Sequence, residues 1–190
     1  MKKALIALAI ASTFVSFGAS AMTKDEHKAA ADQISATYKT DKAACDGMSG
    51  NAKDICTSEA KGKEKIAKAE LDAQYKPSAK ADRKVRDTKA DAAYDTAKEK
   101  CDDQTGNAKD VCVKEAKAAQ TSAKADAKVA KTANDAKAGD ASAAKVSEER
   151  KDASKDKREA DYKVAKERCD TLSGNAKDTC VNDAKTKFGM

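Results

Sequence analysis

The stretch that decides the fold reads Cys45-Asp46-Gly47-Met48-Ser49-Gly50-Asn51-Ala52-Lys53-Asp54-Ile55-Cys56. Two closely similar stretches follow, from Cys101 to Cys112 and from Cys169 to Cys180, and all six cysteines of the chain lie in these three copies. Every copy has a centre of the form Ser/Thr-Gly-Asn-Ala-Lys-Asp. Recurrence of one unit is the sequence signature of a repeat architecture, so the same local structure is expected three times.

The glycine and asparagine at the centre of each copy predict a chain reversal between two helices. Glycine adopts the left-handed conformation that closes a helix. The asparagine that follows can cap the next helix, and an aspartate three residues later is placed like the acidic partner of a capping box. Each copy is therefore expected to form a tight helical hairpin. The turn residues are Gly50, Asn51, Gly106, Asn107, Gly174 and Asn175.

The spacing of the cysteines fits a disulfide across each hairpin. One cysteine lies five residues before the glycine, and the other lies five residues after the asparagine. In a hairpin the two Cα atoms come within the roughly 5–6 Å that a disulfide requires, whereas in one straight helix they would be about 16 Å apart. Closing so short a loop stabilises the fold by roughly 2–3 kcal/mol. The predicted pairs are Cys45–Cys56, Cys101–Cys112 and Cys169–Cys180.

The rest of the chain has the composition of exposed helices. Ala, Lys, Asp and Glu dominate it, and large apolar residues are sparse. Ala, Lys and Glu are strong helix formers, and nearly balanced charges argue against disorder. We therefore predict an all-α, coiled-coil-like protein of three antiparallel helical hairpins, each pinned by a disulfide. They would form either an up-and-down array or a jointed string.

Interruptions of the helical pattern set the expected boundaries. The chain's one proline, Pro77, and the stretch Ala138-Gly139-Asp140 separate the copies, with Asp140 as a fresh cap. Thr23 and Glu26 predict a capping box at the first helix. The expected hairpins span 22–76, 77–139 and 140–190, and the expected helices span 24–49, 52–75, 78–105, 108–138, 141–173 and 176–187.

Small residues are expected to form the contacts between helices. A tyrosine lies one heptad before the first cysteine of each copy, at Tyr38, Tyr94 and Tyr162. One expected seam consists of Cys112, Ala116, Ala119, Ala123, Ala127 and Ala130. Each methyl group buried in such a seam contributes only on the order of 1 kcal/mol to the free energy of folding.

The segment 148–158 is almost wholly polar, which predicts at least one solvent-exposed arm.

The N-terminus predicts export. Lys2 and Lys3 precede an apolar run and the small residues Ala19-Ser20-Ala21, as in a secretory signal peptide spanning 1–21. The run is too short for a permanent anchor, so no membrane span is expected after cleavage. The mature protein is expected in a bacterial periplasm, where cysteines pair. The formal charge of +6 falls to +4 without Lys2 and Lys3, which indicates no nucleic-acid partner.

No combination of residues indicates catalysis. The single histidine, His27, is expected to be an exposed residue of the first helical turn. Catalysis needs convergent groups with tuned pKa values in a pocket, and no cofactor motif is found. Each cysteine pair could hold copper(I) or zinc when reduced, but zinc normally takes four ligands and a hairpin supplies two. We therefore predict a non-enzymatic protein with structural cysteines and no cofactor.

The cysteine hairpin, Cys-Asp…Gly-Asn-Ala-Lys-Asp-x-Cys, resembles a family of Ala/Lys-rich exported helical-repeat proteins of Gram-negative bacteria, often labelled TolA-like. The resemblance covers most of the mature chain and supplies no catalytic residues. True TolA tethers the inner membrane to partners at the outer membrane, whereas this chain is expected to lack both a permanent anchor and a folded C-terminal domain.

The preferred hypothesis is a scaffold, spacer or stress-related binding protein of the cell envelope, with an unknown envelope protein or polymer as its partner. The alternative is a periplasmic metal-binding or thiol-buffering protein that uses the cysteine pairs. A third possibility is a protein that binds an anionic envelope polymer or a lipid surface, which predicts strongly salt-dependent binding.

Overall fold

The computed structural model describes residues 22–190, and the predicted signal peptide lies outside the described residues. The described part consists of six α-helices and two short 3-10 turns, so the predicted all-α fold is confirmed. The 3-10 turns span Cys45–Gly47 and Cys169–Thr171. The helices are α1 (Lys24–Ala44), α2 (Gly50–Tyr75), α3 (Ala79–Cys101), α4 (Gly106–Ala138), α5 (Ala143–Arg168) and α6 (Gly174–Phe188).

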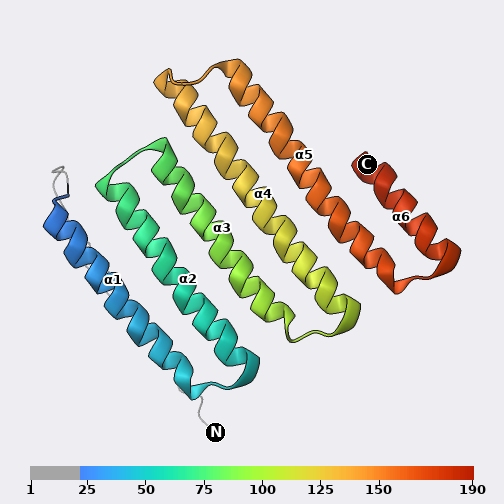
Figure 1. Cartoon of the computed structure of the whole chain (residues 1–190), viewed down its shortest axis with the longest axis horizontal. Helices are drawn as coiled ribbons and strands as arrows, with labels where there is room; N and C mark the ends of the chain where they lie inside the picture. The colour runs from blue at the N-terminus through green and yellow to red at the C-terminus, as the bar shows by residue number, and fades with distance from the viewer. Residues whose placement is uncertain (1–21) are drawn as a thin grey trace, which may run out of the picture.

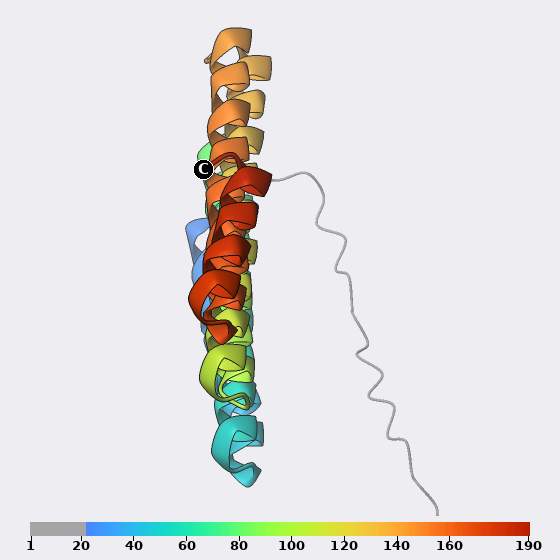
Figure 2. The ribbon, with the colours of Figure 1, turned by 90° about the vertical axis from the view of Figure 1, so that its right-hand side faces the viewer.

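The six helices lie side by side in chain order and run alternately up and down (Figure 1). Seen from the edge, the array is one helix thick (Figure 2). Each helix packs against the next one along the chain, and contacts between hairpins are at least as extensive as those within them. The up-and-down array is therefore the correct one of the two predicted arrangements, and the hairpins do not form a jointed string.

Helix ends follow the local sequence in several places. Thr23 and Glu26 form the predicted capping box, and Gly139 ends α4 in the left-handed conformation, with φ of 87°. The prediction that Asp140 caps the following helix is wrong, because the side chain of Ser142 accepts the hydrogen bond from the N–H of Lys145 and caps α5. All three disulfide turns lie along one end of the array, and the Pro77 and Gly139 turns lie along the other (Figure 1).

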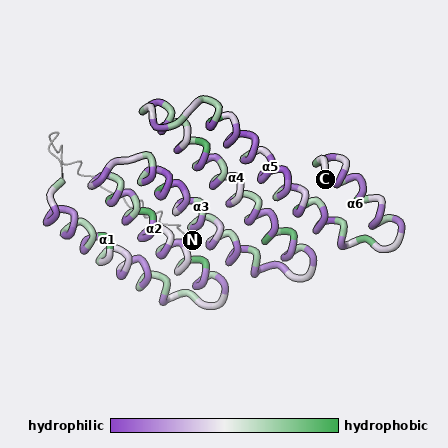
Figure 3. Tube along the Cα trace, turned by 45° about the horizontal axis from the view of Figure 1, so that its top comes forward, coloured by the Kyte–Doolittle hydropathy of each residue, from purple (hydrophilic) through white to green (hydrophobic). Residues whose placement is uncertain are grey.

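The core is thin and consists mainly of alanine methyl groups. Few larger apolar side chains are buried, among them Leu71, Val146 and Val164. The apolar stretches are correspondingly short and scattered along the helices (Figure 3). Helix α1 contains no buried residue at all. Because buried apolar area is the main source of folding free energy, the helices of this protein are held together only weakly away from the disulfides.

Helices inside a single layer need two packing seams on opposite sides. In α4, Ala118 packs with Ala160 and Val164 of α5, whereas Gln120 points the other way and donates a hydrogen bond to Asp91 of α3. The prediction of a single alanine seam on α4 is therefore wrong in part, because Ala119 of that seam is exposed. A helix with one neighbour would have buried the whole seam, but α4 has a neighbour on each flank.

Ion pairs supplement this packing between hairpins. Between α2 and α3 they join Glu59 to Lys100, Lys65 to Asp95 and Glu70 to Lys89, with N···O distances of 3.2, 3.3 and 2.7 Å. All these side chains are largely exposed, and exposed pairs contribute only about 0.2–1 kcal/mol each. They favour one register between neighbouring helices more than they add stability.

The polar segment 148–158 lies in the first half of α5. One flank of this half packs on α4 through Val146, Glu149 and Ala153. The other flank is open, because α6 ends at Phe188 and is much shorter than α5 (Figure 1). The prediction of a solvent-exposed arm is thus confirmed for this segment.

Candidate functional site

The three disulfide turns are the most distinctive chemical feature of the chain. The bonds Cys45–Cys56, Cys101–Cys112 and Cys169–Cys180 join Cα atoms that lie 5.7, 5.6 and 5.8 Å apart, so the predicted pairing is confirmed. The first cysteine of every pair is almost completely buried, and the second is half-buried. No cysteine is free. Each hairpin is therefore fixed covalently at its turn.

The turn itself differs from the prediction. Helix α1 ends at Ala44 rather than at residue 49, and the chain then passes through a 3-10 turn to an extended Ser49, the N-cap of α2. Gly50 is the first residue of α2, with φ of 56°, rather than the residue that closes α1. Gly106 and Gly174 behave in the same way, with φ of 58° and 54°. The left-handed conformation is thus used to enter the second helix.

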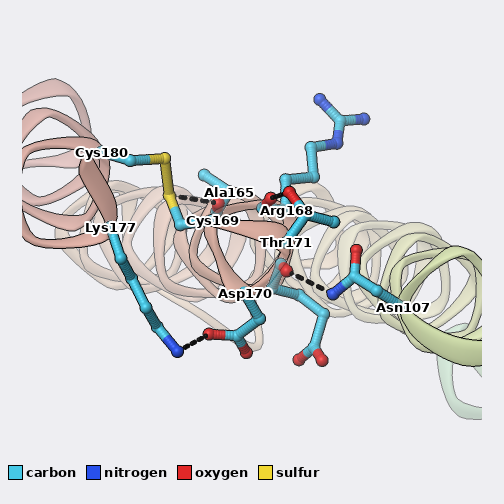
Figure 4. The surroundings of a disulfide bond; sticks show 9 residues. Asn107, Ala165, Arg168, Cys169, Asp170, Thr171, Lys177 and Cys180 are labelled. Atoms are coloured by element: carbon cyan, nitrogen blue, oxygen red, sulfur yellow. Dashed lines mark hydrogen bonds and ion pairs between the residues drawn. A yellow bond between two sulfur atoms is a disulfide. The ribbon is translucent and has the colours of Figure 1, made fainter. Parts of the chain in front are cut away.

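The asparagines do not cap their own helices, which corrects a second prediction. The N-caps are Ser49, Thr105 and Ser173, and none of them makes a side-chain cap hydrogen bond. Instead, Nδ2 of Asn51 donates a hydrogen bond of 2.9 Å to the carbonyl oxygen of Glu99 in α3. Nδ2 of Asn107 donates an equivalent bond of 2.9 Å to Glu167 in α5 (Figure 4).

We call this bond the asparagine clasp. Each acceptor carbonyl belongs to the last turn of its helix and also accepts a backbone N–H, from Asp102 for Glu99 and from Cys169 for Glu167. The clasp therefore adds a second donor to the end of the following hairpin's first helix and ties it to the preceding hairpin. Asn175 holds the same position in the third copy, but it is exposed at the outer edge of α6.

Alanine substitutions should distinguish the asparagines that form a clasp from Asn175, which forms none within residues 22–190. Asn51→Ala or Asn107→Ala is expected to lower the free energy of unfolding by about 1 kcal/mol, since a neutral hydrogen bond contributes roughly 0.5–1.5 kcal/mol. Asn175→Ala, the matched control, should change it by less than about 0.5 kcal/mol. Urea unfolding followed by circular dichroism measures all three. Equal losses at all three positions would show that the asparagines act within their own turns.

A lysine and an aspartate form an ion pair across every turn, a feature that we did not predict. Lys53, Lys109 and Lys177 reach Asp46, Asp102 and Asp170 at 3.2, 3.0 and 2.8 Å. In the third turn, the hydrogen bond with Lys177 lowers the pKa of Asp170 and raises that of the lysine. The signal was present in the sequence, because the two residues recur seven positions apart in each copy.

The sulfur atoms are shielded on one side by the backbone. Sγ of Cys169 lies 3.3 Å from the carbonyl oxygen of Ala165 (Figure 4), and Sγ of Cys45 lies 3.4 Å from that of Asp41. A sulfur in a disulfide has no proton to donate, so these are close contacts only. The geometry of the turn is that of a structural staple.

His27 lies at the opposite end of the first hairpin and is not the exposed residue that we predicted. It is half-buried, its Nε2 lies 3.2 Å from Oδ1 of Asp72 in α2, and its ring lies 4.6 Å from that of Tyr75. Lys84 of α3 donates a hydrogen bond of 2.9 Å to the other oxygen of Asp72. Asp72 therefore joins three helices at the end remote from the disulfide.

The pKa of Asp72 is lowered from its ordinary value, mainly by the hydrogen bond from Lys84 and less by that from His27. A carboxylate with a lowered folded-state pKa stabilises the fold above its unfolded pKa of about 3.9 and loses this contribution as the pH falls through the folded value. Asp72→Asn should therefore destabilise the protein at pH 7 but barely at pH 2. Urea unfolding at both pH values measures this, with Asp103→Asn, an exposed turn residue, as the control. A difference that does not change with pH would contradict the prediction.

A groove of about 920 Å³ lies beside this junction and is lined by residues of four helices. Its lining carries charges of both signs, and includes Lys76, Lys80, Lys131, Asp87 and Asp91. One oxygen of Asp87 is buried without a hydrogen-bond partner, while the other is 3.2 Å from Nε of Arg83.

Comparison with known protein families, curated proteins and solved structures finds no match. The TolA-like resemblance therefore stays a prediction, and any proposed function has to rest on the geometry of the chain itself. Among residues 22–190, no group of three or more His, Cys, Asp or Glu side chains is placed to hold a metal ion. No helix in the same range is long and apolar enough to cross a lipid bilayer.

Proposed function

We propose that this protein is a non-enzymatic helical-repeat protein of the bacterial periplasm that acts as a scaffold or stress-related binding protein of the cell envelope. One observation carries the proposal: every cysteine is paired in a disulfide that staples one hairpin of a flat, one-helix-thick array. Such an array offers two broad faces for binding. The paired cysteines fit an oxidising compartment.

The charge distribution supports a protein partner more than a polyanion. Lysines of α4 lie beside carboxylates of α3 and α5, as in the pairs Lys124–Asp91 and Lys128–Glu149 at 2.6 and 2.7 Å. Neighbouring opposite charges cancel at distances beyond a Debye length, which is about 8–10 Å at physiological salt. The faces therefore present many polar groups without a strong field of one sign.

In-cell photocrosslinking tests the proposal. A photoreactive amino acid replaces either Lys61 or Lys63, two exposed residues of α2 that point to opposite sides of the layer, because they lie two residues apart on a helix. We expect an envelope protein to be crosslinked from one face and not from the other, and the buried Ala60 gives the control position. Absence of any specific crosslink from both faces would overturn the scaffold function.

Mass spectrometry of the exported protein separates this proposal from metal binding or thiol buffering. We expect a chain that begins at Met22, carries three disulfides and contains no metal. Free thiols with one metal ion per cysteine pair would instead establish the alternative function. A chain that keeps residues 1–21 would contradict the predicted export signal.

A further inference from the structure

Neighbouring hairpins pack against each other at two places inside the chain, and we call each of these contacts a joint. The two outer edges of the array carry the two kinds of surface that meet at a joint. At each internal joint, the second helix of one hairpin packs against the first helix of the next, α2 on α3 and α4 on α5. Within residues 22–190, the outer flank of α6 at one edge and that of α1 at the other are not covered by another helix (Figure 1). Helix α6 is the second helix of its hairpin, and α1 is the first helix of its own. The two edges thus carry the two complementary sides of one interface.

The key positions of the joint recur on these edges. The donor of the clasp is Asn175, whose amide has no partner on another helix within residues 22–190. Its acceptor would be the carbonyl of Ala43, which lies two residues before its cysteine, as Glu99 and Glu167 do. At the first joint Ala92 packs tightly against Gly62, and Ala36 is the exposed equivalent of Ala92 on α1.

We propose that α6 of one molecule packs against α1 of a second copy of this chain, with Asn175 bonded to the carbonyl of Ala43 in that copy. The packing continues an interface that already exists inside the chain. Because the two surfaces differ, the contact is head-to-tail and leaves a free edge of each kind, so molecules add in an open row. The inference goes beyond the proposed function, which does not depend on it.

The outer edges also explain why this contact is weaker than the internal joints. Thr179 stands where the inner copies have Ile55 and Val111, and Thr186 stands where they have Gly62 and Ala118. A more polar terminal face is how repeat arrays limit their own growth. Ala44 stands where the later copies have Lys100 and Arg168, so the ion pairs with Glu59 and Glu115 have no equivalent. Association is therefore expected only at high protein concentration.

Restoring the inner residues gives a sharp test. The variant Thr179→Val with Thr186→Ala carries the residues of the second copy, and analytical ultracentrifugation of the oxidised protein compares it with the unchanged chain. We expect the double variant to associate about tenfold more tightly, as 1.4 kcal/mol would give. Adding Asn175→Ala should weaken this association about fivefold. A double variant that stays monomeric to about 1 mM, or one that Asn175→Ala does not affect, would overturn the proposal.

Site-specific crosslinking checks the register. Ser58 and Thr96 lie 3.3 Å apart at the first internal joint, and their equivalents on the outer edges are Asn182 and Thr40. Asn182→Cys and Thr40→Cys are placed in separate molecules, mixed and treated with a short bismaleimide, which leaves the native disulfides untouched. We expect efficient linking of the mixture and little linking of either protein alone. Equal linking of Thr40→Cys with itself would show a symmetric α1 contact and refute the head-to-tail arrangement.

Discussion

Removal of the middle disulfide by Cys101→Ala and Cys112→Ala is expected to lower the free energy of unfolding by about 2–3 kcal/mol, because the bond closes a loop of roughly a dozen residues. For a thin core this is a large fraction of the total, since domains are stable by only about 5–15 kcal/mol. The hairpin of α3 and α4 has neighbours on both sides. We therefore expect the whole array to melt at a lower temperature in one transition.

The matched control is the first disulfide, which has the same sequence separation of 11. Its removal by Cys45→Ala and Cys56→Ala should release mainly α1, because this edge helix contains no buried residue. Circular dichroism gives the melting temperature, and hydrogen exchange shows which helices lose protection. Loss of protection restricted to α3 and α4 in the first variant would show that the hairpins fold independently.

Gly62→Leu is expected to have the second largest effect, a loss of about 1–3 kcal/mol through overpacking. Gly62 of α2 packs directly against Ala92 of α3, so an added Cβ would lie only 3.0 Å from Cβ of Ala92. Leucine extends further from the same position, so the two hairpins must move apart. The clasp between Asn51 and Glu99 then stretches as well.

Two substitutions control for the change in residue type. Thr186→Leu alters the equivalent position on the exposed edge of α6 and should change the stability by less than about 0.5 kcal/mol. Gly62→Ala should be nearly neutral, because the better helix propensity of alanine, worth about 0.5–1 kcal/mol, offsets the tight contact. Thermal unfolding measures all three. A Gly62→Leu variant as stable as the control would show that α2 and α3 can move apart with little loss of stability.

Features of the fold that depend on neighbouring residues could be predicted from the sequence. The disulfides follow from a short spacing, and the capping box of Thr23 and the stop at Gly139 follow from residues within one turn. The role of the asparagines could not be found this way. Asn51 bonds to a residue 48 positions away and Asn107 to one 60 positions away, so local capping rules assigned both to the wrong partner.

The flat array was also beyond local patterns, for a different physical reason. Alanine is small enough to lie in a seam or on a surface, so lines of alanine on α4 did not reveal that this helix has two neighbours. His27 was misplaced because its partners, Asp72 and Tyr75, lie at the far end of the next helix. Only large apolar residues fix which side of a helix is buried, and this chain has few of them.

The constant thickness of the layer sets how this molecule responds to a change in the number of its hairpins. In a globular domain the buried fraction of the surface rises with mass, so larger domains gain stability per residue. A sheet of helices gains breadth in proportion to its mass, and its interior never deepens. A fourth hairpin would therefore broaden the layer and stabilise chiefly the edge hairpin that it covers, without deepening the core of the others. Because no deep core accumulates as hairpins are added, every hairpin benefits from a covalent link of its own, which the disulfide supplies.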